Sequence, residues 1–95
     1  MTSGGRRVTV TFVTAPACHL CDRGREVLAE LAMTYPVDIR EVDLTAPVGV
    51  RALVDSRAPF PPVVLIDGRP IAHGRLSARH LARQFDRLTA PVTGG

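Results

Sequence analysis

The chain has 95 residues, an apolar fraction of 45% and a net charge of +3, which fit one small globular domain. All of its basic residues are arginine, so no reaction step can use a lysine. No apolar run approaches the roughly 18 residues of a membrane span, and aromatic residues are too few to indicate nucleic-acid binding. We therefore expect a cytoplasmic monomer with neither membrane nor nucleic acid among its partners.

The first half of the chain alternates strand and helix patterns. Apolar residues alternate with threonines over residues 7–13 and predict a strand rather than the apolar core of a signal peptide. Helical spacing of apolar residues follows from Cys18 to about Tyr35, where Pro36 ends the helix. Residues 37–44 predict a second strand, whose many charges suit a sheet edge. A short helix follows over residues 47–56, and its expected apolar side is Val50, Leu53 and Val54.

The second half predicts a hairpin and a closing helix. The continuous apolar run of residues 63–66 indicates a central strand covered on both faces. Asp67-Gly68 is typical of a tight hairpin turn, and the return strand over residues 69–72 is placed at an edge by Pro70. Ser77 is placed to cap a last helix that ends near Leu88.

These elements give the order β-α-β-α-β-β-α. We expect a single α/β domain over residues 1–95, with a four-stranded mixed sheet flanked by helices. Its ordered core spans about residues 7–88, between flexible N- and C-terminal tails.

Both cysteines lie in one tetrapeptide, Cys18-His19-Leu20-Cys21, where the first strand gives way to the first helix and Pro16 stands just ahead. Unpaired N–H groups and the helix dipole favour a thiolate at a helix start. The first sulfur of such a pair is exposed and the second is shielded one turn in. We therefore assign nucleophilic attack to Cys18 and resolution to Cys21, and expect the Cys18 thiol to be the more acidic. A protonated His19 would add to this effect.

Two other uses of the cysteine pair stay open. Cys18 and Cys21 could hold zinc or copper(I), with His73 and His80 as the other ligands that a closed zinc site needs. The pair could also be inert. A stabilising disulfide framework is excluded, because a loop this short removes little entropy from the unfolded chain.

A line of arginines marks the last helix. As like charges four residues apart repel weakly, the line has a small energetic cost. It is either a solvated face or a surface for an acidic protein, and binding of nucleic acid is the least favoured reading. The line consists of Arg75, Arg79, Arg83 and Arg87.

The cysteine motif, a proline about forty residues later that opens an apolar strand, the Asp-Gly hairpin and the final helix together resemble one known family. Over about residues 7–88 the chain resembles a glutaredoxin-like member of the thioredoxin superfamily, of the small bacterial branch with a Cys-His-Leu-Cys centre. The resemblance implies a thioredoxin-like, glutaredoxin-type fold. It also implies a cis peptide bond before Pro62, and that the residue preceding Pro62 pairs its backbone with the substrate.

The chain departs from the family pattern where glutathione would bind. The residue before Pro62 is Pro61, which has no N–H to donate. The family's lysine ahead of the first cysteine is replaced by Ala15, and its Gly-Gly pair by Gly74-Arg75, where Arg75 could hold a carboxylate instead. The expected substrate-binding residues are Pro16, Pro61, Pro62, Gly74 and Arg75. Phe12 takes the place of the buried acid of thioredoxins.

The resemblance therefore predicts a thiol-disulfide oxidoreductase that works by dithiol exchange, with Cys18, Cys21 and His19 as its catalytic residues. No cofactor is expected beyond the Cys18–Cys21 disulfide and a possible low-molecular-weight thiol as co-substrate. The expected partners are a disulfide-containing client protein or such a thiol, with a reductase or a thiol pool as electron donor. The alternative function is a carrier of soft metal that uses the same two cysteines.

Overall fold

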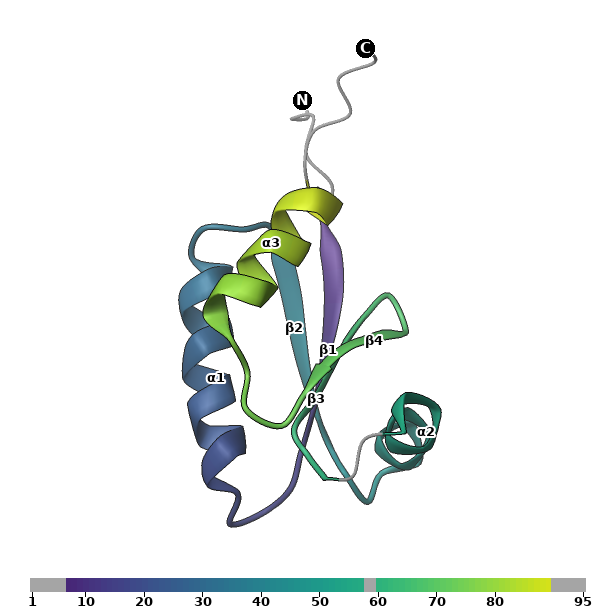
Figure 1. Ribbon diagram of the computed structural model, residues 1–95. Helices are drawn as coiled ribbons and strands as arrows, with labels where there is room; N and C mark the ends of the chain where they lie inside the picture. Colours follow the sequence, from purple (N-terminus) through teal and green to yellow (C-terminus); the bar gives the residue numbers. More distant parts are fainter. Residues whose placement is uncertain (1–6, 58–59, 90–95) are drawn as a thin grey trace.

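The computed structural model describes residues 7–57 and 60–89, which form a sheet with helices on both faces (Figure 1). The tails that we expected to be flexible, 1–6 and 90–95, lie outside the described residues. The elements are β1 Val8–Thr14, α1 His19–Ala32, β2 Val37–Asp43, α2 Pro47–Ser56, β3 Val63–Ile66, β4 Arg69–His73 and α3 Ala78–Thr89.

The sheet has the order β2-β1-β3-β4. β1 runs parallel to β2, with Val8 opposite Val37 and Thr14 opposite Asp43. β3 is antiparallel to both β1 and β4. The predicted mixed sheet is confirmed. The apolar strand β3 is central, and the charged β2 and the proline-containing β4 take the two edges, as predicted.

The main core lies between the sheet and the α1 and α3 helices. Val8, Val10 and Phe12 alternate along β1 toward this side, and each is at most 1% exposed. Leu28 of α1 and Phe85 of α3 close the same cluster. The period-two pattern of β1 therefore anchors both long helices on one face.

A second, smaller core lies under α2 on the other face of the sheet. It consists of Val13, Val63 and Leu65, against which Leu53 packs. The expected apolar side of α2 was partly wrong, because Val50 and Val54 are 49% and 68% exposed. Gly49 lies against the backbone at the end of β2, where an added Cβ would collide with the Asp43 carbonyl. This contact fixes the rotation of α2 about its axis. Successive residues of a helix are about 100° apart, so Val50 and Val54, which directly follow Gly49 and Leu53, point away from the side that faces the sheet.

The ends of two other elements differ from expectation. α1 ends at Ala32 rather than near Tyr35, because the N–H groups of Thr34 and Tyr35 both donate to the Leu31 carbonyl and close a turn. β4 extends by one residue to His73. Ser77 caps α3 as predicted, since its hydroxyl accepts the His80 N–H at 3.1 Å.

The predicted hairpin turn is present between β3 and β4. Asp67 and Gly68 have φ values of 49° and 84°, the left-handed conformation that such a two-residue turn requires. The pairing then shifts between Val64 and Leu65, next to Pro70, which cannot donate to the ladder. This end of the sheet lies away from the cysteines.

Among the described residues, no helix has the length and apolar character that crossing a bilayer requires.

Candidate functional site

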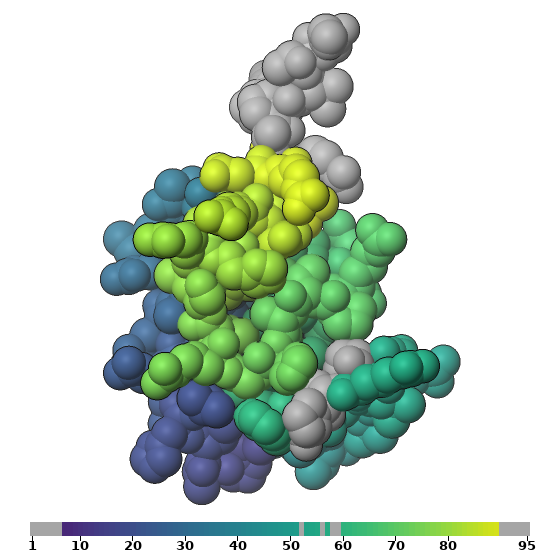
Figure 2. Space-filling model, in the orientation of Figure 1, coloured from purple at the N-terminus to yellow at the C-terminus, as the bar shows by residue number. Residues whose placement is uncertain are grey.

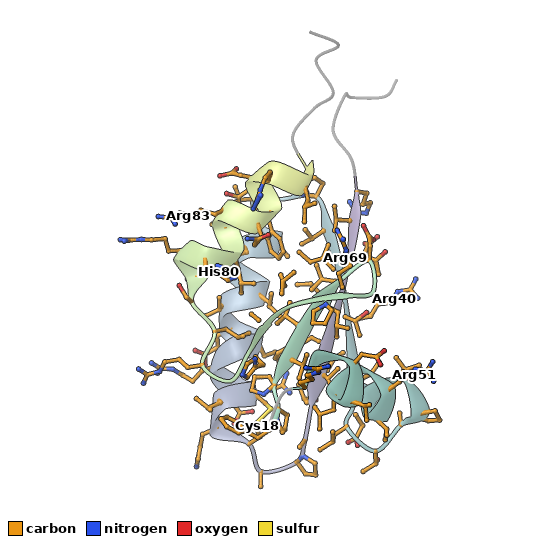
Figure 3. The ribbon with its side chains drawn as sticks, turned by 45° about the vertical axis from the view of Figure 1, so that its right-hand side comes forward. Cys18, Arg40, Arg51, Arg69, His80 and Arg83 are labelled. Carbon is orange, nitrogen blue, oxygen red and sulfur yellow. A yellow bond between two sulfur atoms is a disulfide. The ribbon has the colours of Figure 1, made fainter. Side chains whose placement is uncertain are left out.

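Cys18 and Cys21 form a disulfide at the junction that the sequence indicated, between the end of β1 and the start of α1 (Figure 3). Their Cα atoms are 5.1 Å apart, within the usual range for a disulfide. Cys18 is the N-cap of α1, and its sulfur accepts the N–H of Cys21 at 3.1 Å. The Cys18 sulfur therefore takes the place of a capping oxygen at the positive end of the helix dipole.

The two sulfur-bearing residues differ in exposure. Cys18 is half-buried, whereas Cys21 is only 1% exposed and packs on the inner side of α1. His19, the first residue of the helix, is exposed beside Cys18. A disulfide partner arriving from solvent meets the sulfur of Cys18 first, so the geometry separates an attacking thiol from a resolving one.

The loop before Cys18 holds an exposed proline and a residue with unusual backbone geometry. Pro16 lies in the turn between Thr14 and Cys18, and Ala17 has a φ of 53°. Alanine rarely adopts this left-handed conformation, which costs about 1 kcal/mol or more. Backbone strain of this kind often accompanies functional loops. Here it turns the chain sharply into α1 just ahead of the cysteine.

Pro62 lies at the same end of the sheet as the cysteines. The Pro61-Pro62 bond is cis, as the family resemblance implied. Pro62 is buried at the start of β3, whose Val63 pairs with Val13 of β1. Its carbonyl accepts the N–H of Gly74 at 2.9 Å, and this bond joins the proline turn to the segment before α3. Pro61, half-buried, and Arg75, exposed, flank this bond in the chain.

An ionic network beside the dithiol was not foreseen from the sequence. Arg25 of α1 binds Asp22 at 2.9 Å and Glu41 of β2 at 2.6 Å. The Thr14 hydroxyl donates to the same Glu41 carboxylate at 3.0 Å. The hydrogen bonds from Arg25, more than the one from Thr14, hold the pKa of Glu41 below its usual value. The network ties the first turn of α1 to the ends of β1 and β2.

A signal for this network exists in the sequence, but it depends on register. Glu41 lies opposite Phe12 in the parallel β1–β2 pair and so faces α1. A charged side chain in a predicted edge strand is expected to face solvent, and only the register of the strand pair shows which face of the sheet it lies on.

Next to the cysteine pair is an open cavity of about 700 Å³, between the first turns of α1 and the segment before α3. The sequence prediction included His19 and Arg75 but missed the other residues that line it. Arg23 and Arg75 lie far apart in the chain, so no local motif relates them. The full lining is His19, Leu20, Asp22, Arg23, Val27, Arg75 and Leu76.

The residues considered as metal ligands have other positions. The ring nitrogen Nε2 of His80 donates to the Ile71 carbonyl at 3.2 Å, a contact that ties α3 to β4. His73 is exposed at the end of β4. Over residues 7–57 and 60–89, no group of three or more His, Cys, Asp or Glu side chains is arranged to hold a metal ion.

Comparison with solved structures shows a thioredoxin-like fold. A point mutant of thioredoxin from Halobacterium salinarum NRC-1 superimposes with a TM-score of 0.67 at 19% identity, covering 90% of this chain and 77% of that one. A structure described as a malarial protein gives a TM-score of 0.65 at 16% identity, covering 87% of this chain and 98% of that one. At these identities the likeness concerns the fold.

A search of curated proteins found no match. The family model for the glutaredoxin-like domain (DUF836) matches residues 9–86, which span every element except the first residue of β1 and the last three residues of α3. The chain therefore belongs to the glutaredoxin-like DUF836 family.

Proposed function

We propose that the protein is a cytoplasmic thiol-disulfide oxidoreductase in which Cys18 attacks and Cys21 resolves. The observation that supports this most is the asymmetry of the pair: the Cys18 sulfur caps α1 at the surface, and Cys21 is 1% exposed behind it. A family of glutaredoxin-like proteins and a thioredoxin-like fold suggest redox chemistry in general. The division of roles between the two sulfurs rests on their positions.

The proposed reaction is a two-electron transfer to a client disulfide. The Cys18 thiolate attacks one client sulfur, the client S–S bond breaks, and the second client sulfur leaves as a thiol after taking a proton. The Cys21 thiol, after losing its proton, then attacks Cys18, which restores the Cys18–Cys21 disulfide and releases the first client sulfur. The client gains two electrons and the protein loses two. A reductase or a thiol pool reduces the protein again.

The prolines near the dithiol are the proposed resting place of the substrate. Pro61 lacks the N–H that would pair with a substrate backbone, and this argues against tight glutathione binding through that contact. We propose instead that the exposed Pro16 and the half-buried Pro61 form a rigid edge beside Cys18, and that Pro62, buried at the start of β3, holds Pro61 in place. A disulfide-bearing client protein, or a low-molecular-weight thiol, would rest against this edge.

Single-cysteine variants can distinguish the roles of the two sulfurs. Reduced Cys21→Ser incubated with bis(2-hydroxyethyl) disulfide is expected to accumulate a mixed disulfide on Cys18, visible by mass spectrometry, while Cys18→Ser accumulates far less. The reduced protein with both cysteines should reduce this disulfide, and it should also reduce the disulfides of insulin. If Cys18→Ser forms the adduct faster, the assignment of roles is wrong. If reduced protein binds zinc or copper(I) tightly and turns over no disulfide, the carrier function replaces the redox one.

A further inference from the structure

The cavity beside the dithiol has a lining that combines charge with apolar surface. Its polar lining residues are His19, Asp22, Arg23 and Arg75, and its apolar lining residues are the half-buried Leu20, Val27 and Leu76. In Figure 2 the light-green atoms of the segment before α3 lie directly against the purple and blue atoms of the start of α1. The cavity is open to solvent and is lined by His19 and Leu20, the two residues that follow Cys18 in the chain.

The two arginines of the cavity are unpaired. Arg23 and Arg75 are exposed, and neither makes an ion pair or a side-chain hydrogen bond with another residue of the described chain. The one carboxylate of the lining, Asp22, is already bound by Arg25 at 2.9 Å. Arg7 and Arg25 have carboxylate partners, whereas Arg79, Arg83 and Arg87 of α3 have none within the described residues. The cavity therefore presents two unpaired guanidinium groups, and its one carboxylate, Asp22, shares Arg25 with Glu41.

The geometry relates these groups to the reacting sulfur. Arg23 is five residues, or about 1.4 turns, along α1 from Cys18, which at 1.5 Å per residue is a rise of about 7.5 Å along the helix axis. A client residue in extended conformation spans about 3.3 Å. A client joined to Cys18 by a mixed disulfide therefore reaches Arg23 with two or three residues. The apolar side chains that line the cavity then contact the aliphatic groups of the client.

We propose that this cavity binds an acidic segment of the client polypeptide, located within about three residues of its reactive cysteine. The client carboxylates pair with Arg23 and Arg75, and an adjacent aliphatic side chain packs on Leu20, Val27 and Leu76. Arginine is suited to this role because its planar group binds carboxylates through two hydrogen bonds. The proposal rests on the redox function above and names its substrate class.

The test uses matched peptides. Each peptide carries one cysteine, blocked as a mixed disulfide with 2-mercaptoethanol, and flanking residues that are Glu, Gln or Lys in an otherwise identical sequence. With reduced protein, the second-order rate constant for reduction of the peptide disulfide is expected to fall from Glu to Gln to Lys, by about tenfold overall at low salt, a factor that corresponds to about 1.4 kcal/mol. Because exposed charge pairs are screened, the preference should shrink at high salt.

The variants locate the preference. In Arg23→Gln/Arg75→Gln the ratio of Glu to Lys peptides is expected to fall below about twofold. Arg83→Gln removes the same charge from α3, at the other end of the molecule from Cys18 (Figure 3), and should keep the ratio of the parent protein. Circular dichroism checks that each variant is folded. A preference that survives in the double variant, or that is lost in Arg83→Gln, overturns the proposal.

Two further substrates separate this inference from the function on which it rests. If the parent protein does not reduce the uncharged bis(2-hydroxyethyl) disulfide, the redox function itself fails. If it reduces that compound but treats Glu and Lys peptides alike, only the cavity assignment fails. A preference found for the small anionic 3,3′-dithiodipropionate but absent among the peptides also overturns the assignment to a polypeptide.

Discussion

At the scale of single residues, the site depends on a sulfur atom that serves as a helix cap. Cys18 accepts the Cys21 N–H through the atom that we expect to react. A thiolate is a better acceptor than a neutral thiol, so the same contact that starts α1 favours the reactive form. Serine at this position would still cap the helix, which makes Cys18→Ser a variant that keeps the fold and loses the chemistry.

His19 gives the first prediction, because it is exposed beside Cys18 and has no hydrogen bond or ion pair within the described chain. A cationic imidazole one residue from Cys18 stabilises the thiolate. His19→Ala is therefore expected to slow alkylation of Cys18 by iodoacetamide several-fold at mildly acidic pH, and to lower the reduction potential. Quenched alkylation followed by mass spectrometry measures the rate.

His80→Ala is the matched control for this measurement. It removes a second imidazole, whose contact is with the Ile71 carbonyl between α3 and β4. Its alkylation rate should equal that of the parent protein. Equal rates in His19→Ala would remove His19 from the mechanism.

At the scale of elements, Gly24 explains how closely α1 approaches the sheet. A glycine inside a helix is unfavourable by about 1 kcal/mol relative to alanine. An added Cβ at Gly24, however, would lie 2.9 Å from Leu76 Cδ1 and 3.1 Å from Phe12 Cζ. The glycine lets the helix rest on the aromatic ring of Phe12.

The second prediction follows from this contact. Gly24→Ala is expected to lower the free energy of unfolding by roughly 1 kcal/mol, because crowding against the buried Phe12 ring exceeds the gain in helix propensity. Urea unfolding measures the change. In a Phe12→Leu background, which makes room at this point, the same substitution should be neutral or stabilising. A gain in stability from Gly24→Ala alone would show that α1 can shift freely.

The third prediction concerns the network that joins α1 to β2. Glu41 has a lowered pKa, so its contribution to stability is present above the ordinary pKa of glutamate and is lost as the pH falls through the lower folded value. Since the Glu41 side chain is 40% exposed, Glu41→Gln should cost about 1 kcal/mol or less at pH 7. The difference between Glu41→Gln and the parent protein should vanish in acid.

Urea unfolding over a range of pH measures this effect. Asp55→Asn serves as the control, because the Arg51–Asp55 pair is more exposed and 3.7 Å long, and its loss should change little at any pH. A Glu41→Gln difference that stayed constant with pH would indicate a packing effect instead of a charge effect.

The elements also show what a sequence can predict here and what it cannot. The alternation in β1, the apolar run of β3 and the Asp67-Gly68 turn are local patterns, and they led to the correct order of elements along the chain and to the correct central and edge strands. The proline turn was predicted through a family resemblance. By contrast, the exposed side of α2 depends on Gly49 touching the end of β2, and the cavity depends on Arg23 and Arg75 lining the same space from distant parts of the chain. Such contacts between distant segments leave no periodic signal.

At the scale of the whole molecule, the disulfide closes a short loop and the fold rests on its two apolar cores. Chain entropy assigns a loop of this length about 2 kcal/mol or less. The fourth prediction is therefore that oxidised and reduced protein share one far-UV circular dichroism spectrum and both unfold cooperatively, with unfolding free energies within about 2 kcal/mol of each other. Urea unfolding with and without dithiothreitol measures the difference. Unfolding on reduction alone would assign the disulfide a structural role.

The tight turn at Asp67-Gly68 has a practical consequence for such measurements. β3 starts beside the site at Pro62 and carries the chain to the opposite end of the sheet, where an added Cβ on Gly68 would touch nothing within 4 Å. Both turn residues are exposed. A linker or an affinity tag inserted at this turn would hold the molecule on a surface with Cys18 facing outward. The protein could then serve as an immobilised bait in the Cys21→Ser form, with its reactive end free for clients.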